Sequence, residues 1–369
     1  MGRARRSFPA PLSNPLVIDT DQQLASFVEL LRGADWVAID TEADSLHSYP
    51  EKLCLLQIAI PGHVDLVDVL AGSSLDPLWN VLKGRELLMH GADYDLRLLK
   101  GGHDFVPTSI FDTMLAARLV GRPRFGLGDL VQDYLGITLE KSSQKANWAR
   151  RPLTPKMTEY ALNDARYLEP LVEKLRSELR AKEREDWHQQ ECAQLIVDNT
   201  RLTGPDPERV WRIKGSNKLQ PHALAILREL WHWREKEAAR LDRPPFFVLA
   251  HDRMIGLADA ASNGQTFDHL LPRRISPRRR EAILNAIKKG KSVPEDECPQ
   301  RIKSPQRRNV SGQQKKRFGE LINRRDQHAE SLGIDPTLIA SRATLMALAN
   351  SVEENADNLL GWQREILAV

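Results

Sequence analysis

Cysteine is scarce in this chain of 369 residues, which contains only Cys54, Cys192 and Cys298, far apart in the sequence. An odd number of separated cysteines argues against a disulfide framework and against a zinc site, and it indicates a reducing compartment. Long apolar runs are also missing, so no segment is predicted to span a membrane. The basic N-terminal stretch has no apolar segment behind it and does not resemble a secretory signal. We therefore expect a cytoplasmic protein.

Aromatic residues make up only 6% of the chain, but hydrophobic residues reach 41% and charged residues 28%, an ordinary globular composition. The length predicts two or three domains. The net charge of +3 hides an asymmetry: residues 1–200 hold 23 Lys and Arg against 29 Asp and Glu, and residues 201–369 hold 30 against 21. Such asymmetry suggests a polyanionic partner for the basic half. The alternative is a basic surface that only keeps this half in solution.

The front half alternates strand and helix patterns, and from about residue 93 it becomes mostly helical. Three neighbouring strands joined by short turns suggest an antiparallel meander, and the whole order predicts a mixed sheet flanked by helices. Strands are predicted at residues 16–18, 35–39, 53–60, 63–67 and 86–90, and helices at 21–31 and 75–82.

Strand patterns nearly vanish beyond about residue 198. Residues 223–241 have apolar side chains at helical spacing, and Pro244 and Pro245 end this predicted helix. Residues 291–315 are polar and broken by proline, as is typical of a linker. A last helical segment follows, with Asp335 and Pro336 as a predicted helix start.

Asp40 and Glu42 follow the apolar run at residues 35–39 with one residue between them. Side chains alternate along a strand, so both carboxylates lie on the same face at the end of a buried strand. Two carboxylates held in this way repel each other and resist desolvation unless a cation neutralises them. Ligation by oxygen alone suits Mg²⁺ or Mn²⁺. Taken alone, however, this triplet is most often a surface pair.

Two later segments add acidic residues to this pair. A glycine turn after the strand at 86–90 leads into a helix that brings Asp95 to the carboxyl end of the sheet, where Asp93 competes with it but could instead cap the helix. Tyr160 and Asp164 are four residues apart and share one helix face. A phenol beside a metal-bound carboxylate can orient a water molecule, whereas an ordinary core tyrosine is the alternative.

In this order the motifs resemble those of the DEDD exonuclease superfamily, tyrosine subclass: Asp40 and Glu42 match the first motif, Asp95 the second, and Tyr160 with Asp164 the third. Longer stretches, DTEADSLHSYPEKLCLLQIA, SIFDTMLAARLVG and KANWARRPLTPKMTEYALNDARYL, resemble the ribonuclease D family within it. The resemblance implies an α/β fold in which an RNase H-like mixed-sheet exonuclease domain is followed by one or two all-α domains of the HRDC (helicase-and-RNase-D C-terminal) type.

The domain boundaries that we expect are residues 1–205 for the exonuclease domain and 210–292 for the HRDC domain. Residues 308–369 resemble a degenerate second HRDC-like domain. HRDC domains are helical modules that often bind nucleic acid. Residues 273–317 hold 15 Lys and Arg against 4 acids, which suits contacts with phosphates. A solvated basic linker is the alternative.

The resemblance implies a 3′–5′ exoribonuclease that uses two divalent cations, Mg or Mn, and releases nucleoside 5′-monophosphates. Asp40, Glu42, Asp95 and Asp164 would hold the cations, and Tyr160 would position the attacking water. RNA is the expected partner. The resemblance to the family implies tRNA precursors as substrates and a role in tRNA 3′ processing. No obligate protein partner is evident.

Four residues near the motifs are weaker candidates for contacts with nucleic acid. Arg150 and Arg151 precede the third motif and could meet the phosphate backbone, and His47 and Tyr49 follow the first motif and could touch the terminal nucleotide. For each of the four, a surface or packing role is an equal alternative.

Three other polar residues receive structural expectations. Asn147 stands where the family commonly has an acidic residue, which puts local substrate contacts in doubt. Asp112, in the FDTMLAARL segment that we expect to be helical, is expected to cap or orient rather than to catalyse. Gln57 lies in a core strand and is expected to satisfy backbone groups.

Two other functions compete with the exoribonuclease. A 3′–5′ DNA exonuclease would use the same chemistry, because nothing in the motifs distinguishes a ribose 2′-OH from its absence. A catalytically inactive RNA-binding module is the second alternative, against which the full set of four acids and a tyrosine argues.

Overall fold

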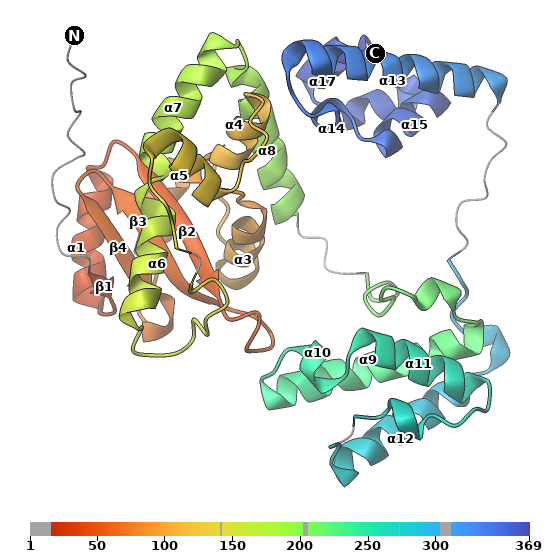
Figure 1. Ribbon diagram of the computed structural model, residues 1–369. Coiled ribbons are helices and arrows are strands. Elements are labelled where there is room, and N and C mark those ends of the chain that lie inside the picture. The colour runs from red at the N-terminus through yellow and green to blue at the C-terminus, as the bar shows by residue number, and fades with distance from the viewer. Residues whose placement is uncertain (1–15, 141, 202–205, 273, 303–310) are drawn as a thin grey trace, which may run out of the picture. The chain divides into compact units, whose positions relative to one another are not determined.

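The computed structural model describes residues 16–140, 142–201, 206–272, 274–302 and 311–369 (Figure 1). The chain forms two compact units. The first contains the described residues of Met1–Ala43, Leu53–Arg201 and Asn309–Val369, and the second those of Asp44–Lys52 and Leu202–Arg308. None of the described helices is long and apolar enough to cross a membrane.

A six-stranded mixed sheet with the order β1-β4-β3-β2-β5-β6 forms the centre of the first unit. The strands are β1 Val17–Ile18, β2 Val37–Ala43, β3 Leu53–Ile60, β4 His63–Asp68, β5 Glu86–Met89 and β6 Ser109–Asp112. Strands β2, β3 and β4 pair antiparallel, which confirms the predicted meander, whereas β1, β5 and β6 join the sheet by parallel pairing. The edge strand β6 was not predicted from the sequence.

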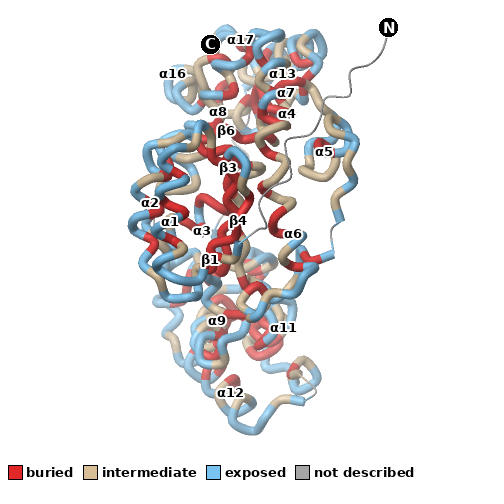
Figure 2. Tube along the Cα trace, turned by 90° about the vertical axis from the view of Figure 1, so that its left-hand side faces the viewer, coloured by how far each residue is buried: buried red, intermediate tan, exposed pale blue. Residues whose placement is uncertain are grey.

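Helices cover both faces of this sheet, and every residue of the central strand β3 is buried (Figure 2). Side chains of α1, α2 and α3 pack with Val37 and Ile39 on one face. Side chains of α4, α5, α6 and α7 pack with Ala38 on the other, the face that also carries Asp40 and Glu42. The helices of this region are α1 Asp21–Arg32, α2 Asp76–Lys83, α3 Asp93–His103, α4 Thr113–Leu119, α5 Leu127–Leu135, α6 Pro155–Arg166, α7 Leu168–Ala181 and α8 Glu185–Thr200.

Helix α6, which carries the third motif, begins after a threonine cap and has proline at its first position. The Thr154 hydroxyl accepts a hydrogen bond from the Met157 amide at 3.3 Å, and Pro155 occupies the first helical position, where no amide donor is needed. The helix buries Met157, Ala161 and Ala165 toward the sheet. This spacing places Tyr160 and Asp164 at the side of the buried stripe.

The C-terminal segment belongs to the first unit (Figure 1, blue). Its helices are α13 Gly312–Leu332, α14 Pro336–Ile339, α15 Arg342–Asn350, α16 Val352–Asn355 and α17 Gly361–Leu367. Asp335 caps α14 as predicted, since its carboxylate accepts from the Thr337 amide at 2.7 Å. The indole rings of Trp187 in α8 and Trp362 in α17 stack with centroids 4.6 Å apart. The segment therefore shares a hydrophobic core with the sheet-bearing part of the unit.

A close backbone approach also joins this segment to the rest of the unit. Gly121 has a φ of +88°, and a Cβ atom added there would lie 2.2 Å from the carbonyl oxygen of Gly333. Only glycine tolerates both conditions.

The second unit is helical, with α9 Pro221–Leu241, α10 Pro245–Val248, α11 His251–Ser262 and α12 Pro277–Lys291. Helix α9 confirms the helix predicted at 223–241. Trp211, Leu227, Met254 and Ile283 form part of its core. Of the predicted linker at 291–315, residues 303–310 lie outside the described residues. Short 3-10 turns are η1 Val69–Ala71, η2 Ser216–Lys218, η3 Asp268–Leu270, η4 Glu295–Glu297 and η5 Ala356–Asn358.

Candidate active site

Three carboxylates meet where β2 passes beneath α6. Asp40 and Glu42 project from β2, and Asp164 projects from α6. Carboxylate oxygen atoms from the three residues all lie within 4.8 Å of one another. Residues that are more than 120 positions apart in the sequence thus form one acidic cluster.

Asp95 lies in the first turn of α3 and is only 7% exposed. The Thr41 hydroxyl donates a hydrogen bond to its carboxylate. Asp93, the competing candidate, is 57% exposed at its side chain and pairs with Arg97 at 3.3 Å. The arrangement therefore favours Asp95 over Asp93 as the acid of the second motif.

The cluster is electrostatically unfavourable without a cation. Burial is the first cause that raises the pKa of each acid, to about 9 for Glu42, about 7 for Asp164 and about 6 for Asp95. Repulsion from neighbouring carboxylates adds to burial. The pKa of Asp40 is raised well above its usual value by burial and then by Asp95, Asp164 and Glu42. These acids resist ionising together.

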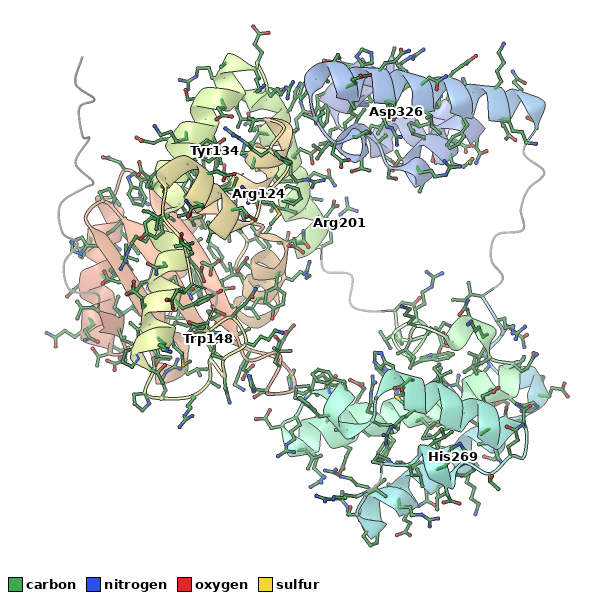
Figure 3. All side chains as sticks on the ribbon, viewed as in Figure 1. Arg124, Tyr134, Trp148, Arg201, His269 and Asp326 are labelled. Carbon is green, nitrogen blue, oxygen red and sulfur yellow. The ribbon has the colours of Figure 1, made fainter. Side chains whose placement is uncertain are left out.

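Tyr160 borders the cluster and hydrogen-bonds to Asp164. Burial, followed by the nearby carboxylates, raises the pKa of this phenol above its usual value, so the hydroxyl keeps its proton and donates a hydrogen bond to Asp164. The ring centroid lies 6.0 Å from that of the buried Trp148, which Figure 3 labels. The two rings are tilted by 40° to each other.

The residues present fit divalent cations. The donor set consists of carboxylate oxygens, which suit Mg²⁺ or Mn²⁺ and not the softer metals that select thiolate or imidazole. A bound cation would also offset the burial and the repulsion that raise the four pKa values. Asp40, Glu42 and Asp164 could hold one ion directly, and Asp95 lies close enough to Asp40 to influence its ionisation.

Asp112 supports the second motif from an adjacent element. It ends β6 and caps α4, since its carboxylate accepts from the amides of Met114 at 2.8 Å and Leu115 at 3.0 Å. Its second oxygen accepts from the Ala92 amide at 2.8 Å, which fixes the turn that leads into α3. The expectation that Asp112 caps and orients is confirmed. The prediction that Asp112 lies inside a helix is wrong, because Asp112 is the last residue of strand β6.

Thr41 is a supporting residue that sequence reasoning did not identify. It lies between Asp40 and Glu42, and strand alternation turns it toward the opposite face of the sheet, where α3 packs. A hydroxyl on that face is the one signal in the sequence that could have suggested a partner in α3.

The expectation that the Gln57 side chain satisfies backbone groups is wrong. Its side chain is 0% exposed, and neither amide atom has a hydrogen-bond partner among the described residues. The correction follows from the sheet, in which the backbone groups of β3 already pair with β2 and β4.

The two arginine candidates differ in their surroundings. The Arg151 guanidinium donates to the Asp68 carboxylate at 2.6 Å, to the Cys54 carbonyl at 3.0 Å and to the Trp148 carbonyl at 2.7 Å. These contacts favour a structural role for Arg151 over contact with phosphates. Arg150 is exposed and makes no such clamp with its side chain in the described part of the chain.

The two candidates after the first motif belong to the second unit by their contacts. Tyr49 donates through its hydroxyl to Glu235 and through its amide to the Asp242 carboxylate at 3.1 Å. The His47 amide donates to the Asp44 carbonyl at 2.7 Å. Neither residue takes part in the acidic cluster.

Comparison with known proteins shows matches along most of the chain. The 3′–5′ exonuclease family matches residues 15–180, and the HRDC domain family matches residues 223–265. Ribonuclease D of Jannaschia sp. is 31% identical over 366 residues, which cover 95% of this chain and 93% of that protein. Ribonuclease D of Escherichia coli is 28% identical over 367 residues, with 96% of each chain covered.

Solved structures agree with these matches. The crystal structure of Escherichia coli RNase D, described as an exoribonuclease involved in structured RNA processing, aligns with a TM-score of 0.75 at 27% identity and covers 96% of this chain and 97% of that one. A protein from Bifidobacterium adolescentis aligns with a TM-score of 0.81 at 22% identity, covers 96% and 95% respectively, and shows the fold alone. The predicted combination of an RNase H-like exonuclease fold with an HRDC-type helical domain is confirmed.

Proposed function

The chain belongs to the ribonuclease D family of 3′–5′ exoribonucleases, and from this premise we propose that it removes nucleotides one at a time from RNA 3′ ends with two divalent cations. The products are nucleoside 5′-monophosphates. The observation that carries the proposal is the cluster of Asp40, Glu42 and Asp164, whose carboxylate oxygens lie within 4.8 Å of one another. Asp95 completes the set of four acids.

The four carboxylates hold the cations, which when bound lower the pKa of the attacking water and stabilise the leaving 3′ oxygen. Tyr160 orients that water. Its hydroxyl proton is engaged by Asp164, so the lone pairs of the phenol oxygen remain to accept a hydrogen bond from the water. Thr41, on the face of β2 that packs against α3, holds Asp95 in place through its hydrogen bond.

The Asp40→Ala variant tests the site. It should abolish metal-dependent release of mononucleotides and leave RNA binding largely intact, because the carboxylates act as a unit and the basic helical unit binds separately. Glu29→Gln, which alters an exposed carboxylate on α1, is the matched control and should be fully active. Full activity of Asp40→Ala would refute the assignment.

RNA is the proposed substrate, and structured precursors such as tRNAs with 3′ extensions are the proposed natural targets. Family membership supports this choice over DNA. Digestion of matched RNA and DNA oligonucleotides with Mg²⁺ tests it, since faster release from DNA would identify a DNA exonuclease instead. The three cysteines of the chain are buried and free, which supports a reducing, cytoplasmic location.

In this proposal the second unit, which contains the HRDC domain at 210–292, supplies affinity for RNA. Its helix α12 ends with Lys288, Lys289 and Lys291 on the last turn; all three are exposed, and Lys289 pairs with Glu229 at 2.7 Å. Each phosphate contact to single-stranded RNA contributes about −0.7 to the slope of log affinity against log salt. Replacing Lys288 and Lys291 with Gln should therefore flatten that slope by up to about 1.4.

Lys174→Gln provides the control for this experiment, because Lys174 is an exposed helix lysine of the first unit. It should leave the salt slope unchanged. An unchanged slope in the Lys288/Lys291 variant would count against a role of α12 in RNA binding. The second HRDC-like domain at 308–369 stays a proposal, and its helices share a hydrophobic core with the rest of the first unit.

A further inference from the structure

Gln57 lies in the middle of β3, directly opposite Asp40 of β2 in the antiparallel register. Residues directly opposite each other project to the same face of the sheet, with Cβ atoms roughly 5 Å apart. On its other side, Gln57 pairs with Leu66 of β4, whose side chain has no polar atom. Asp40 is therefore the polar residue directly across the sheet from the Gln57 amide.

The chemistry of this position makes an amide unexpected. Gln57 is 0% exposed, and both its side-chain oxygen and nitrogen lack hydrogen-bond partners among the described residues. Its neighbours along the same strand face, Leu55 and Ala59, belong to the hydrophobic core beneath α6. An unpaired buried amide destabilises a fold, and most native proteins pair nearly all such groups. An apolar side chain would suit the fold better at this site.

We propose that Gln57 is a positioning residue whose side-chain amide donates a hydrogen bond to the Asp40 carboxylate when the cluster holds divalent cations. The inference rests on the proposed function, because it assigns Gln57 to the same site. An ionised carboxylate is a strong acceptor, and a donor fixed on the neighbouring strand would set its orientation. Groups that hydrogen-bond to metal ligands orient them, and their loss typically weakens metal affinity or activity roughly tenfold to a hundredfold.

The Gln57→Met variant tests the proposal, because methionine has the same length without the amide. Removing an unpaired buried amide should raise the Tm of the metal-free protein by roughly 2–4 °C. The same change should weaken Mn²⁺ binding, measured by titration calorimetry, by roughly tenfold or more. The kcat for RNA should fall, whereas KM should stay near its wild-type value, because Gln57 does not touch RNA.

Thr113→Val is the matched control. The Thr113 hydroxyl is also fully buried, but it donates to the Met89 carbonyl at 3.1 Å. Its loss should lower the Tm and leave Mn²⁺ affinity unchanged, the opposite pattern to that of Gln57→Met. Gln57→Leu, a second apolar replacement, should reproduce the Gln57→Met result if methionine packs poorly.

Two results would overturn the proposal. A lower Tm in both apolar variants would mean that the amide is paired in the folded protein, and an unchanged Mn²⁺ affinity would mean that it does not serve Asp40. These failures are separate from failure of the proposed function. A wild-type protein that neither binds Mn²⁺ nor degrades RNA would refute the function itself, whereas an active wild type with indifferent Gln57 variants would refute only the role of Gln57.

Discussion

Binding of divalent cations to the acidic cluster should release protons, because the metal-free acids are held partly protonated at neutral pH. Burial and mutual repulsion raise the pKa of Glu42 to about 9 and that of Asp164 to about 7. A bound cation needs both carboxylates ionised, so their protons must leave when the cation enters.

The number of protons follows from these values. At pH 7 an acid with a pKa of about 9 is almost fully protonated and one with a pKa of about 7 is half protonated, so Glu42 and Asp164 together hold about 1.5 protons. The pKa of Asp40 is raised in the same direction, first by burial. Metal affinity should therefore strengthen by about tenfold or more for each pH unit between 6 and 8.

Titration calorimetry with Mn²⁺ at pH 7 measures the proton number directly, when it is repeated in buffers of different ionisation enthalpy. The slope of the observed enthalpy against the buffer enthalpy should give between one and three protons released. Glu29→Gln, at an exposed carboxylate outside the cluster, should give the wild-type slope. A slope near zero, together with a Kd that does not change between pH 6 and 8, would refute the electrostatic account of the cluster.

Three other predictions concern stability and turnover. Because the pKa values of Glu42 and Asp164 are raised in the fold, these two groups stabilise the metal-free protein most below about pH 4, and this stabilisation is lost as the pH rises toward 9. The Tm of the metal-free protein should therefore fall over this pH range. Added Mg²⁺ should restore the Tm most strongly at high pH. Tyr160→Phe should lower kcat less than Asp164→Ala does, because it removes one hydrogen bond and leaves every carboxylate in place; equal wild-type rates in both would mean that the third motif is misplaced. Gly121→Ala should destabilise the fold by about 2–3 kcal/mol in denaturant titrations, and by more than Gly136→Ala, which shares a positive φ but has open space around the added Cβ; equal losses would show that the contact with the C-terminal segment contributes nothing.

Much of the sheet could be predicted from the sequence, because three of its strands are long enough to show a pattern. Residues 53–60 form β3 with the predicted bounds, and β2 and β4 lie within a few residues of prediction. The four-residue strand β6 was not predicted, because its last two residues, Phe111 and Asp112, begin the FDTMLAARL segment that we expect to be helical. Its omission placed Asp112 inside a helix instead of at the strand end from which it caps α4.

The acidic residues could be identified from the sequence, but the contacts that support them could not. The first and third motifs supply Asp40, Glu42 and Asp164, and the fold brings oxygen atoms of these carboxylates within 4.8 Å of one another. The bond from Thr41 to Asp95 and the register that places Gln57 opposite Asp40 depend on strand pairing and helix placement, neither of which has a local signal. Register is set by the packing of the whole sheet.

The C-terminal segment shows a second limit of sequence reasoning. The sequence predicts a helical segment here, with Asp335 and Pro336 as a helix start, but not the surface that its helices cover. Trp362 stacks on Trp187 of α8, and the segment packs within the first unit instead of forming a compact unit of its own. Removing residues 213–369 would therefore also uncover α8, which is why the lysine variants of α12 are the cleaner test of RNA binding.

The most direct test of the central claim follows the fate of the terminal nucleotide of a single-stranded RNA. The RNA carries a label in its 3′-terminal nucleotide, and a second preparation is labelled at the 5′ end. With Mg²⁺, the wild-type protein should release the 3′ label at once as a nucleoside 5′-monophosphate, while the 5′-labelled strand shortens one nucleotide at a time. Asp40→Ala should leave both strands intact. Internal fragments as the first products, or shortening by Asp40→Ala at the wild-type rate, would contradict the account.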